Sequence, residues 1–283
     1  MAVLMDGKAL AAKLRGNFRS ESDALAQKGT RPGLAVVIVG EDPASKIYVR
    51  NKQRACEECG IYSRTHTLSA ETSEQELIAL VHELNRDPEI HGILVQSPLP
   101  GHISERAVVE NIAPSKDVDA FSYENVGRIV AGDYRFLPCT PAGVMELLDE
   151  YKIEIEGKNC VVVGRSDIVG KPQAMMLLHR NGTVTICHSR TKNLGAALKE
   201  ADIIVAAVGR AGLITGDMVK EGAVVIDVGM NRNEAGKLCG DVDFAEVSPK
   251  ASFITPVPGG VGPMTITMLM KNTITSAKNA QNG

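Results

Sequence analysis

Four side chains that could perform chemistry together lie within the first 120 residues: Tyr48, Lys52, Gln96 and Asp119. Tyr48 and Lys52 are four residues apart, so in a helix a flat ring and an amine would lie one turn apart on the same face. Gln96 ends the run "GILVQ" and Asp119 lies in "KDVDAF", both at places where strands of a parallel sheet would end. A phenol, an amine, an amide and a carboxylate could therefore address one ligand.

The element that must position Tyr48 and Lys52 is a helix predicted to end near Gly60. Asp42 and Pro43 are typical of the cap and first turn of a helix, and a glycine commonly follows the last turn. Lys52 falls inside the apolar stripe of this helix. One interpretation is a lysine whose stem covers apolar surface while its amine stays in water. The other is that the stripe forms the wall of a cleft at this point.

The pattern beyond residue 33 indicates two α/β domains. Strand-like runs and amphipathic helical runs alternate from "GLAVVIVG" to "HGILVQS", which predicts parallel strands covered by helices. The stretch 113–143 is rich in turn-forming residues, and the alternation restarts at "NCVVVG". We expect a first domain of residues 1–140 plus 263–283 and a second of 141–262. The second domain should be a Rossmann-type doubly wound parallel sheet, and the C-terminal helix should return to the first domain.

The second domain begins with a candidate dinucleotide loop. "CVVVGRSDIVGKPQAMMLL" reads as a strand, a tight loop and a helix, with the spacing Gly164-x-Ser166-x-x-x-Gly170 instead of GxGxxG. The motif alone could be a structural turn, but the strand before it, the helix after it and the further strand runs favour dinucleotide binding. A NAD site usually has an acidic residue after the second strand. That strand is followed here by His188, Ser189 and Arg190.

The basic residues near this loop favour NADP over NAD. Arg165 lies in the first loop and Arg190 in the second, beside Ser189, and guanidinium groups offer forked, charge-assisted hydrogen bonds to a phosphate dianion. The alternative is that both arginines are ordinary surface charges.

Composition excludes several other classes of protein. The chain has 283 residues, a formal charge of -3 and 44% apolar residues, so no basic excess invites nucleic acid. The longest apolar runs are strand-sized, which argues against a membrane span, and "MAVLMDGKAL" lacks the features of a signal peptide. We therefore expect a soluble cytoplasmic protein without nucleic-acid or membrane partners.

Cysteine and histidine spacing predicts neither a metal site nor a disulfide framework. "CEEC" at Cys56 and Cys59 has redox or zinc spacing, but it lies late in a helix and no second pair completes a tetrahedral site. His91 and His188 have no partner at ligand spacing. We interpret the cysteines as packing residues.

Many separate blocks, in order over nearly the whole chain, resemble the bifunctional methylenetetrahydrofolate dehydrogenase/methenyltetrahydrofolate cyclohydrolase family. They are "PASKIYVRNKQRACEECGI", "GILVQSPLP", "KDVDAF", "PCTPAG", "VVVGRSDIVGKP", "CHSRTKNL", "GAVVIDVGMN", "GDVDF" and "TPVPGGVGPMT". Two departures flank presumed substrate residues: the family usually has leucine at Ser97 and glycine at Ala120. Both bear on the shape of the pocket, and neither removes a functional group.

The resemblance implies NADP-dependent oxidation of 5,10-methylenetetrahydrofolate to 5,10-methenyltetrahydrofolate and its hydrolysis to 10-formyltetrahydrofolate. It also implies a homodimer and tetrahydrofolate derivatives as ligands. The catalytic residues implied are Lys52, Gln96, Asp119 and Tyr48; the substrate-binding residues are Tyr48, Ser45, Asp119, Pro258, Gly259 and Gly260; the cofactor-binding residues are Gly164, Arg165, Ser166, Ser189, Arg190, Thr140 and Gly170. By the family pattern Lys52 is central, Gln96 supports it, Tyr48 stacks on the pterin or its neighbouring ring, and Asp119 holds the pterin.

The implied chemistry constrains Lys52. Hydride loss places positive charge on the one-carbon unit, and a protonated amine beside it would raise the barrier. We therefore expect Lys52 to be partly desolvated so that its neutral form is accessible. Two other functions fit a similar layout. One is an NADP dehydrogenase acting on shikimate, which also uses a lysine and an aspartate. The other is a non-catalytic NADP-binding regulator, which would need neither Lys52 nor Asp119.

Overall fold

The structure is a computed structural model that describes residues 2–282, except the side chains of Ala44 and Asn282. Its contacts divide the chain into two compact units. Unit 1 comprises residues 1–11 and 140–265, and unit 2 comprises residues 12–139 and 266–283. Each unit is an α/β structure with its own parallel sheet, as the sequence predicted.

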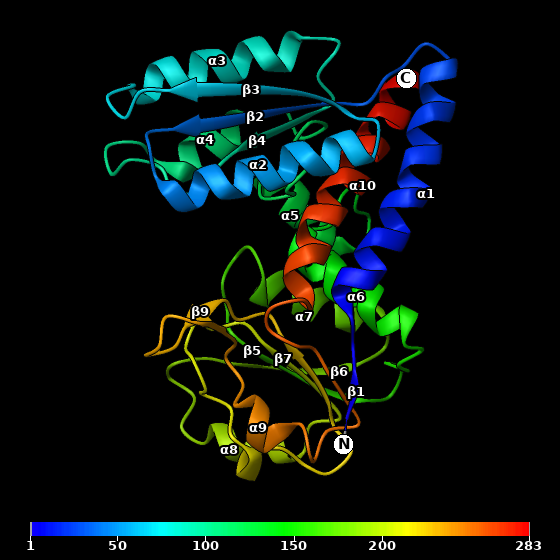
Figure 1. The fold of residues 1–283 in the computed structure, drawn as a ribbon, viewed down its shortest axis with the longest axis vertical. Helices are drawn as coiled ribbons and strands as arrows, with labels where there is room; N and C mark the ends of the chain where they lie inside the picture. Colours follow the sequence, from blue (N-terminus) through cyan, green and yellow to red (C-terminus); the bar gives the residue numbers. More distant parts are fainter. Residues whose placement is uncertain (1, 283) are drawn as a thin grey trace. The chain divides into compact units, whose positions relative to one another are not determined.

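Unit 2 is built on a three-stranded parallel sheet in the order β3-β2-β4. The strands are β2 (Gly33–Val39), β3 (Tyr62–Leu68) and β4 (Gly92–Val95). Helices α2 (Pro43–Glu58) and α3 (Glu74–Arg86) lie on opposite faces of this sheet (Figure 1). The remaining helices of this unit include α4 (Glu105–Asn111) and α5 (Tyr123–Ala131).

The core of unit 2 follows from the alternation in its strands. All seven residues of β2 are buried, and Ala35, Val37 and Val39 pack with Leu77 and Val81 of α3. Helix α3 is amphipathic and begins with a capping box. Ser73 and Glu76 satisfy each other's backbone amides there, at 3.2 and 2.8 Å. Both faces of β2 are thus covered, as expected for a parallel strand.

Unit 1 holds a six-stranded parallel sheet in the order β1-β11-β8-β7-β5-β6. Its strands are β1 (Val3–Leu4), β5 (Asn159–Val163), β6 (Thr183–Cys187), β7 (Ile203–Ala206), β8 (Val224–Asp227) and β11 (Phe253–Ile254). After β6 the chain returns across β5 to form β7 on its other side. This reversal creates the topological switch point of a doubly wound sheet, where ligands bind beyond the carboxyl ends of the strands.

Further elements of unit 1 include α6 (Cys139–Glu150), α7 (Gly170–His179), α8 (Leu194–Lys199), η1 (Gly216–Met218) and α9 (Phe244–Val247). A short antiparallel hairpin, β9 (Asn231–Arg232) and β10 (Leu238–Cys239), follows β8. Helix α1 (Gly7–Gln27) leads into unit 2.

The N-terminal segment departs from the expected domain ranges. The sequence placed residues 1–11 with the first domain, most of which corresponds to unit 2. The structure places these residues in unit 1 instead, which holds most of the predicted second domain. The reason is that Val3 and Leu4 pair in parallel with Phe253 and Ile254, so β1 extends the edge of the six-stranded sheet.

The C-terminal helix α10 (Val261–Asn282) returns to unit 2, the predicted first domain, as expected. From residue 266 onward it belongs to unit 2. There Asn272 Nδ2 donates to Val118 O at 2.8 Å, and Ser276 Oγ donates to Ser115 O at 2.8 Å. These bonds link the end of the chain to the segment that carries Asp119.

Candidate functional site

Helix α2 forms where the sequence predicted it. Asp42 caps the helix by accepting a 2.7 Å hydrogen bond from Ser45 N–H, and Pro43 occupies the first turn. The helix ends at Glu58, and Gly60 follows with φ +70°. The apolar part of the stripe is fully buried: Ala55, Cys56 and Cys59.

Lys52 lies on this helix and meets the residue that follows β4. Its Nζ donates to Gln96 Oε1 at 2.9 Å. Gln96 is held by two further bonds, from its N–H to Val37 O at 2.8 Å and from Nε2 to Ser97 O at 2.6 Å. Helix α2 and the end of β4 thus bring together two residues that are 44 positions apart.

The amine of Lys52 is in an unusual environment for a lysine. Burial lowers its pKa below the ordinary value of 10.5, and the negative charge of Asp119 opposes part of that shift. Burial likewise raises the pKa of Asp119, while the charge of Lys52 lowers it and the charge of Asp117 raises it. The neutral amine is therefore easier to reach than in a solvent-exposed lysine.

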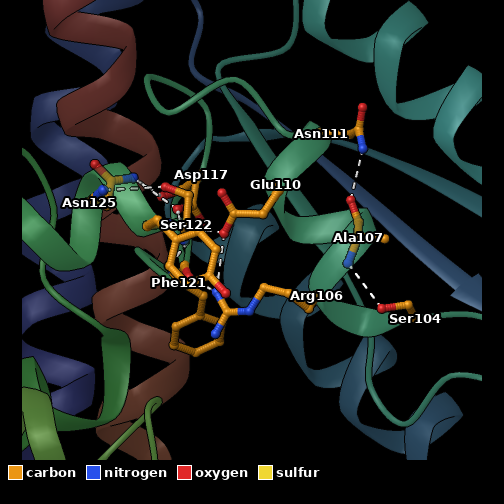
Figure 2. Close-up of polar contacts among 10 residues, drawn as sticks. Ser104, Arg106, Ala107, Glu110, Asn111, Asp117, Phe121, Ser122 and Asn125 are labelled. Atoms are coloured by element: carbon orange, nitrogen blue, oxygen red, sulfur yellow. Dashed lines mark hydrogen bonds and ion pairs between the residues drawn. The ribbon is translucent and has the colours of Figure 1, made fainter.

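The loop that carries Asp119 is fixed by its neighbours. Asp117 is 2% exposed and accepts hydrogen bonds from Ser122 N at 2.8 Å and Asn125 Nδ2 at 2.9 Å. Figure 2 shows this cluster beside α4, where Arg106 Nη1 donates to Phe121 O at 3.0 Å. Asp117 is thus a structural carboxylate whose acceptor capacity is used within the loop.

The two departures from the family pattern have clear structural settings. Ala120 has φ +59° and is fully buried, which explains why glycine suits this position. Ser97 contacts Gln96 through its backbone carbonyl, a group that every residue provides. The support of Gln96 therefore does not depend on the Ser97 side chain.

Sequence reasoning missed two residues around Asp119. Cys139 Sγ donates to Asp119 Oδ1 at 3.5 Å, and burial raises the pKa of this thiol well above its ordinary value. Asn272 Nδ2 bonds to Val118 O at 2.8 Å and Leu137 O at 2.9 Å. The block "PCTPAG" was a signal that could have drawn attention to Cys139, but nothing in the sequence of α10 singles out Asn272.

Ser45 and Tyr48 differ in accessibility. Tyr48 is 37% exposed, so its ring can contact a ligand. Ser45 is 3% exposed, and its backbone amide is bonded to the Asp42 cap. Ser45 is therefore buried in the first turn of α2, and Tyr48 is accessible one turn later.

Cys56 and Cys59 fit the packing interpretation. Burial raises the pKa values of Cys56 and Cys59 to about 12, which disfavours a reactive thiolate. His91 Nδ1 accepts from Gly33 N at 3.1 Å, and His188 Nδ1 accepts from Arg190 N at 3.1 Å. Among the described residues, no group of three or more His, Cys, Asp or Glu side chains could hold a metal ion.

The candidate cofactor loop lies between β5 and α7 and depends on two glycines. Gly164 has φ +135°, and a Cβ there would lie 2.2 Å from Ala207 O. A Cβ on Gly170 would lie 2.3 Å from Gly164 O. Ser166 Oγ accepts from the amides of Val169 and Gly170 at 3.2 and 3.3 Å. The loop can turn this tightly into the helix only because both glycines lack side chains.

The basic residues expected to bind a phosphate follow adjacent strands. Val163 of β5 pairs with Cys187 of β6, so the loops that begin at residues 164 and 188 leave the same edge of the sheet. Arg165, Ser189 and Arg190 are all exposed on these loops. Exposed guanidinium groups and a hydroxyl are suitable donors for a phosphate dianion, so these residues fit NADP.

The other predicted residues of unit 1 lie in loops or helix starts. Thr140 is in the first turn of α6, with its Oγ1 2.9 Å from Thr265 Oγ1. Pro258, Gly259 and Gly260 lie between β11 and α10, and Gly259 has φ +107°. Gly259 O accepts from Lys8 N at 3.0 Å, which ties this turn to the start of α1.

A large cavity lies elsewhere in unit 2. Its volume is about 1080 Å³, and its lining includes Arg31, Tyr62, His91, Lys116 and Arg135. Tyr62 begins β3 and His91 precedes β4, whereas Gln96 follows β4. The cavity thus lies at the amino ends of these strands, whereas Gln96 lies at the carboxyl end of β4.

Within residues 2–282, no helix is long and apolar enough to cross a membrane.

Comparison with known proteins agrees with this arrangement. Residues 5–119 match the tetrahydrofolate dehydrogenase/cyclohydrolase catalytic domain, and residues 138–281 match the NAD(P)-binding domain of the same family. The bifunctional protein FolD of Moorella thermoacetica is 61% identical over 277 residues, covering 98% of this chain and 99% of that protein.

Solved structures give the same result. The FolD methylenetetrahydrofolate dehydrogenase/cyclohydrolase of Campylobacter jejuni has a TM-score of 0.97 at 52% identity, covering 99% of both chains. The Trypanosoma brucei enzyme, solved with NADP cofactor and inhibitor, has a TM-score of 0.95 at 40% identity, covering 100% of this chain and 99% of that one. This chain belongs to the tetrahydrofolate dehydrogenase/cyclohydrolase family.

Proposed function

We propose that this chain performs two consecutive steps on a folate-bound one-carbon unit. It oxidises 5,10-methylenetetrahydrofolate to 5,10-methenyltetrahydrofolate with NADP and hydrolyses the product to 10-formyltetrahydrofolate. The observation that carries the proposal is the 2.9 Å bond between Lys52 Nζ and Gln96 Oε1, in a setting that lowers the pKa of the amine. A shikimate dehydrogenase or a non-catalytic regulator would not explain the Lys52–Gln96 pair in a chain that matches this folate enzyme family.

The oxidation step favours an uncharged Lys52. Loss of hydride from the methylene bridge leaves a cation, and a neighbouring ammonium would repel it. Burial disfavours the ammonium form of Lys52, which reduces that repulsion. The carboxylate form of Asp119 acts on Lys52 electrostatically. The pair can therefore accommodate the positive charge that develops on the substrate.

The hydrolysis step uses the same amine for proton transfer. Water must lose a proton as it adds to the methenyl carbon, and the ring nitrogen must gain one as the ring opens. An amine with a lowered pKa exchanges protons nearer neutral pH than a free lysine does. Gln96 accepts one N–H of Lys52 and thereby directs the remainder of the amine.

We assign pterin recognition to Asp119 and Tyr48. A pterin edge presents an N–H beside an amino group, and a carboxylate can accept from both. The exposed ring of Tyr48 offers a flat surface on the helix that carries Lys52. Ser45 is buried at the start of this helix, so we propose a supporting role for it. Pro258, Gly259 and Gly260 provide a turn that a ligand can approach closely.

NADP, when bound, supplies the acceptor for the hydride. We propose that Arg165, Ser189 and Arg190 hold the phosphate on its ribose. Gly164, Ser166 and Gly170 shape the loop at the start of α7, and Thr140 contributes its hydroxyl from α6. The positive end of a helix favours the negative pyrophosphate of a dinucleotide.

A paired assay tests this function. Purified protein with 5,10-methylenetetrahydrofolate and NADP should form NADPH, with transient absorbance from methenyltetrahydrofolate. Supplied methenyltetrahydrofolate should lose that absorbance faster than in buffer, without NADP. Failure to reduce NADP would rule out the dehydrogenase activity, and hydrolysis at the buffer rate would rule out the cyclohydrolase activity.

A homodimer and a cytoplasmic location complete the proposal. Both rest on the resemblance to the family. Light scattering during size-exclusion chromatography should give twice the 30.2 kDa mass of the chain.

A further inference from the structure

The motif "GDVD" at residues 240–243 places a buried carboxylate under the loop that follows β7. Asp241 is 0% exposed, and its two oxygens accept from three consecutive backbone amides. The distances are 2.7 Å to Val208 N, 3.1 Å to Gly209 N and 2.8 Å to Arg210 N. These bonds join the motif to a loop more than 30 residues earlier in the chain.

The backbone around Asp241 is built to admit the carboxylate. Asn231 Nδ2 adds a fourth donor at 2.9 Å. A Cβ on Gly229 would lie 2.4 Å from Asp241 Oδ1, so a side chain at that position would displace the carboxylate. A neighbouring carboxylate, Asp227, accepts from Asp241 N at 2.9 Å, and a Cβ on Gly240 would lie 1.8 Å from Asp227 Oδ2. Two glycines and four donors therefore define one position for Asp241.

The loop that Asp241 holds lies directly against the candidate cofactor loop. Ala207, just before the held amides, donates its N–H to Val163 O at 2.7 Å. The carbonyl oxygen of Ala207 would lie only 2.2 Å from a Cβ on Gly164, so the two loops are in close contact. Both loops leave the carboxyl ends of β5 and β7, which flank the switch point of the sheet. A shift of residues 207–210 would therefore change the wall of the cofactor site.

We propose that Asp241 is a positioning residue for NADP. It fixes residues 208–210 in one conformation, so that the cofactor binds a preformed site and does not have to order the loop. Preorganisation of this kind increases affinity because less conformational freedom is lost on binding. This proposal rests on the proposed function, because it assumes that unit 1 binds NADP.

The substitution Asp241→Asn tests the proposal with little change in shape. A carboxamide replaces one acceptor oxygen with an N–H₂ group, which cannot accept from the loop amides. The loop loses hydrogen bonds to a carboxylate, so we expect the Kd for NADP to rise about 10- to 100-fold. Hydrolysis of methenyltetrahydrofolate without NADP should stay within about twofold of wild type, because Lys52 and Gln96 belong to unit 2.

Asp202→Asn is the matched control. Asp202 also accepts a backbone amide, Asn159 N at 2.8 Å, and pairs with Lys220 at 2.6 Å, but it lies at the amino ends of the same strands. This variant should lower the melting temperature and leave the Kd for NADP unchanged. A wild-type Kd in Asp241→Asn would overturn the proposal, as would an equal loss of NADP affinity and cyclohydrolase rate.

A second variant decides the matter if Asp241→Asn does not fold. Asn231→Ala removes one donor to Asp241 and keeps the carboxylate. It should raise the Kd for NADP about two- to fivefold, less than Asp241→Asn does, because the three loop amides keep their acceptor. An unchanged Kd would contradict the proposal. Failure of the proposed function is distinguishable, because the wild-type protein itself would then show no NADP binding.

Discussion

Asp119 in unit 2 and Asp241 in unit 1 are two carboxylates with opposite surroundings. Asp241 accepts four hydrogen bonds from N–H groups at 2.7–3.1 Å. Asp119 accepts from a thiol at 3.5 Å and feels the charge of Lys52, and burial raises its pKa. A carboxylate surrounded by strong donors holds structure together, whereas one with a weak donor beside a titratable amine keeps capacity for a ligand.

The two units differ in how they stabilise buried charged groups. In unit 1, four hydrogen bonds satisfy the buried carboxylate of Asp241 and fix the loop of residues 208–210. Unit 2 leaves Lys52 and Asp119 partly desolvated, which shifts both pKa values toward the neutral forms. We therefore expect substitutions in unit 2 to act on the reaction and substitutions around Asp241 to act on binding and stability.

The largest expected effect comes from Lys52→Met. Loss of the amine removes the group that we propose transfers protons, so the cyclohydrolase rate should fall about 10²- to 10⁴-fold. The Kd for NADP, measured by fluorescence titration, should not change. Arg54→Met on the same helix is the control, because Arg54 is exposed and pairs with Glu58 at 3.1 Å. Full cyclohydrolase activity in Lys52→Met would refute the assignment.

A pH effect on stability should come from Asp227, the neighbour of Asp241. Burial raises the pKa of Asp227 from 3.8 to about 6, so the folded state binds this proton more tightly than the unfolded chain. Its contribution is present below about pH 4 and is lost as the pH rises through 6. That loss corresponds to about 3 kcal/mol of unfolding free energy.

Urea unfolding of wild type and Asp227→Asn between pH 4 and pH 7 measures this contribution. The wild-type free energy of unfolding should decline relative to that of the variant as the pH rises. Parallel pH profiles would show that the amides of Gly229, Asp241 and Val242 offset the effect of burial completely.

Asp119→Asn should produce a smaller loss than Lys52→Met. An amide still offers one acceptor oxygen to the pterin but loses the charge and the second oxygen, so kcat/KM for the folate substrate should fall about 10- to 100-fold. Steady-state kinetics at saturating NADP measures the effect. An equal loss in Asp117→Asn, together with unchanged stability, would show that the two neighbouring carboxylates have been assigned in reverse.

The smallest effect is expected from Ala120→Gly. Glycine relieves the cost of φ +59° but removes a buried methyl group and adds freedom to the unfolded chain. These contributions oppose one another, so the free energy of unfolding should change by less than about 1 kcal/mol. Ala120→Val, with a branched side chain in the left-handed region, should destabilise clearly more. Equal stabilities for the two variants would contradict the backbone argument.

Local patterns in the sequence predicted much of the fold and the surroundings of Lys52. Helix α2 begins and ends at its capping residues, and the stripe of Ala55, Cys56 and Cys59 is buried as expected. Gln96 could be expected near Lys52 because strand ends meet at one edge of a parallel sheet. Periodicity and capping signals extend over a few turns, and these features depend on nothing more distant.

The features that sequence reasoning missed depend on distant segments. Asn272 reaches Val118 across 154 positions, and Asp241 reaches Val208 across 33. Residues 1–11 join unit 1 through a two-residue strand that is too short to have a detectable pattern. The left-handed backbone at Ala120 is invisible because alanine gives no signal for it. Tertiary contacts of this kind leave no periodic trace.

We propose that the Lys52 amine is poised between its charged and neutral forms. Nuclear magnetic resonance titration of protein carrying ¹³C-labelled lysine, assigned with Lys52→Met, measures this directly. Lys52 should titrate below the ordinary lysine pKa of 10.5, in the direction that burial dictates, while exposed lysines titrate near that value. A titration of Lys52 at or above 10.5 would contradict the account.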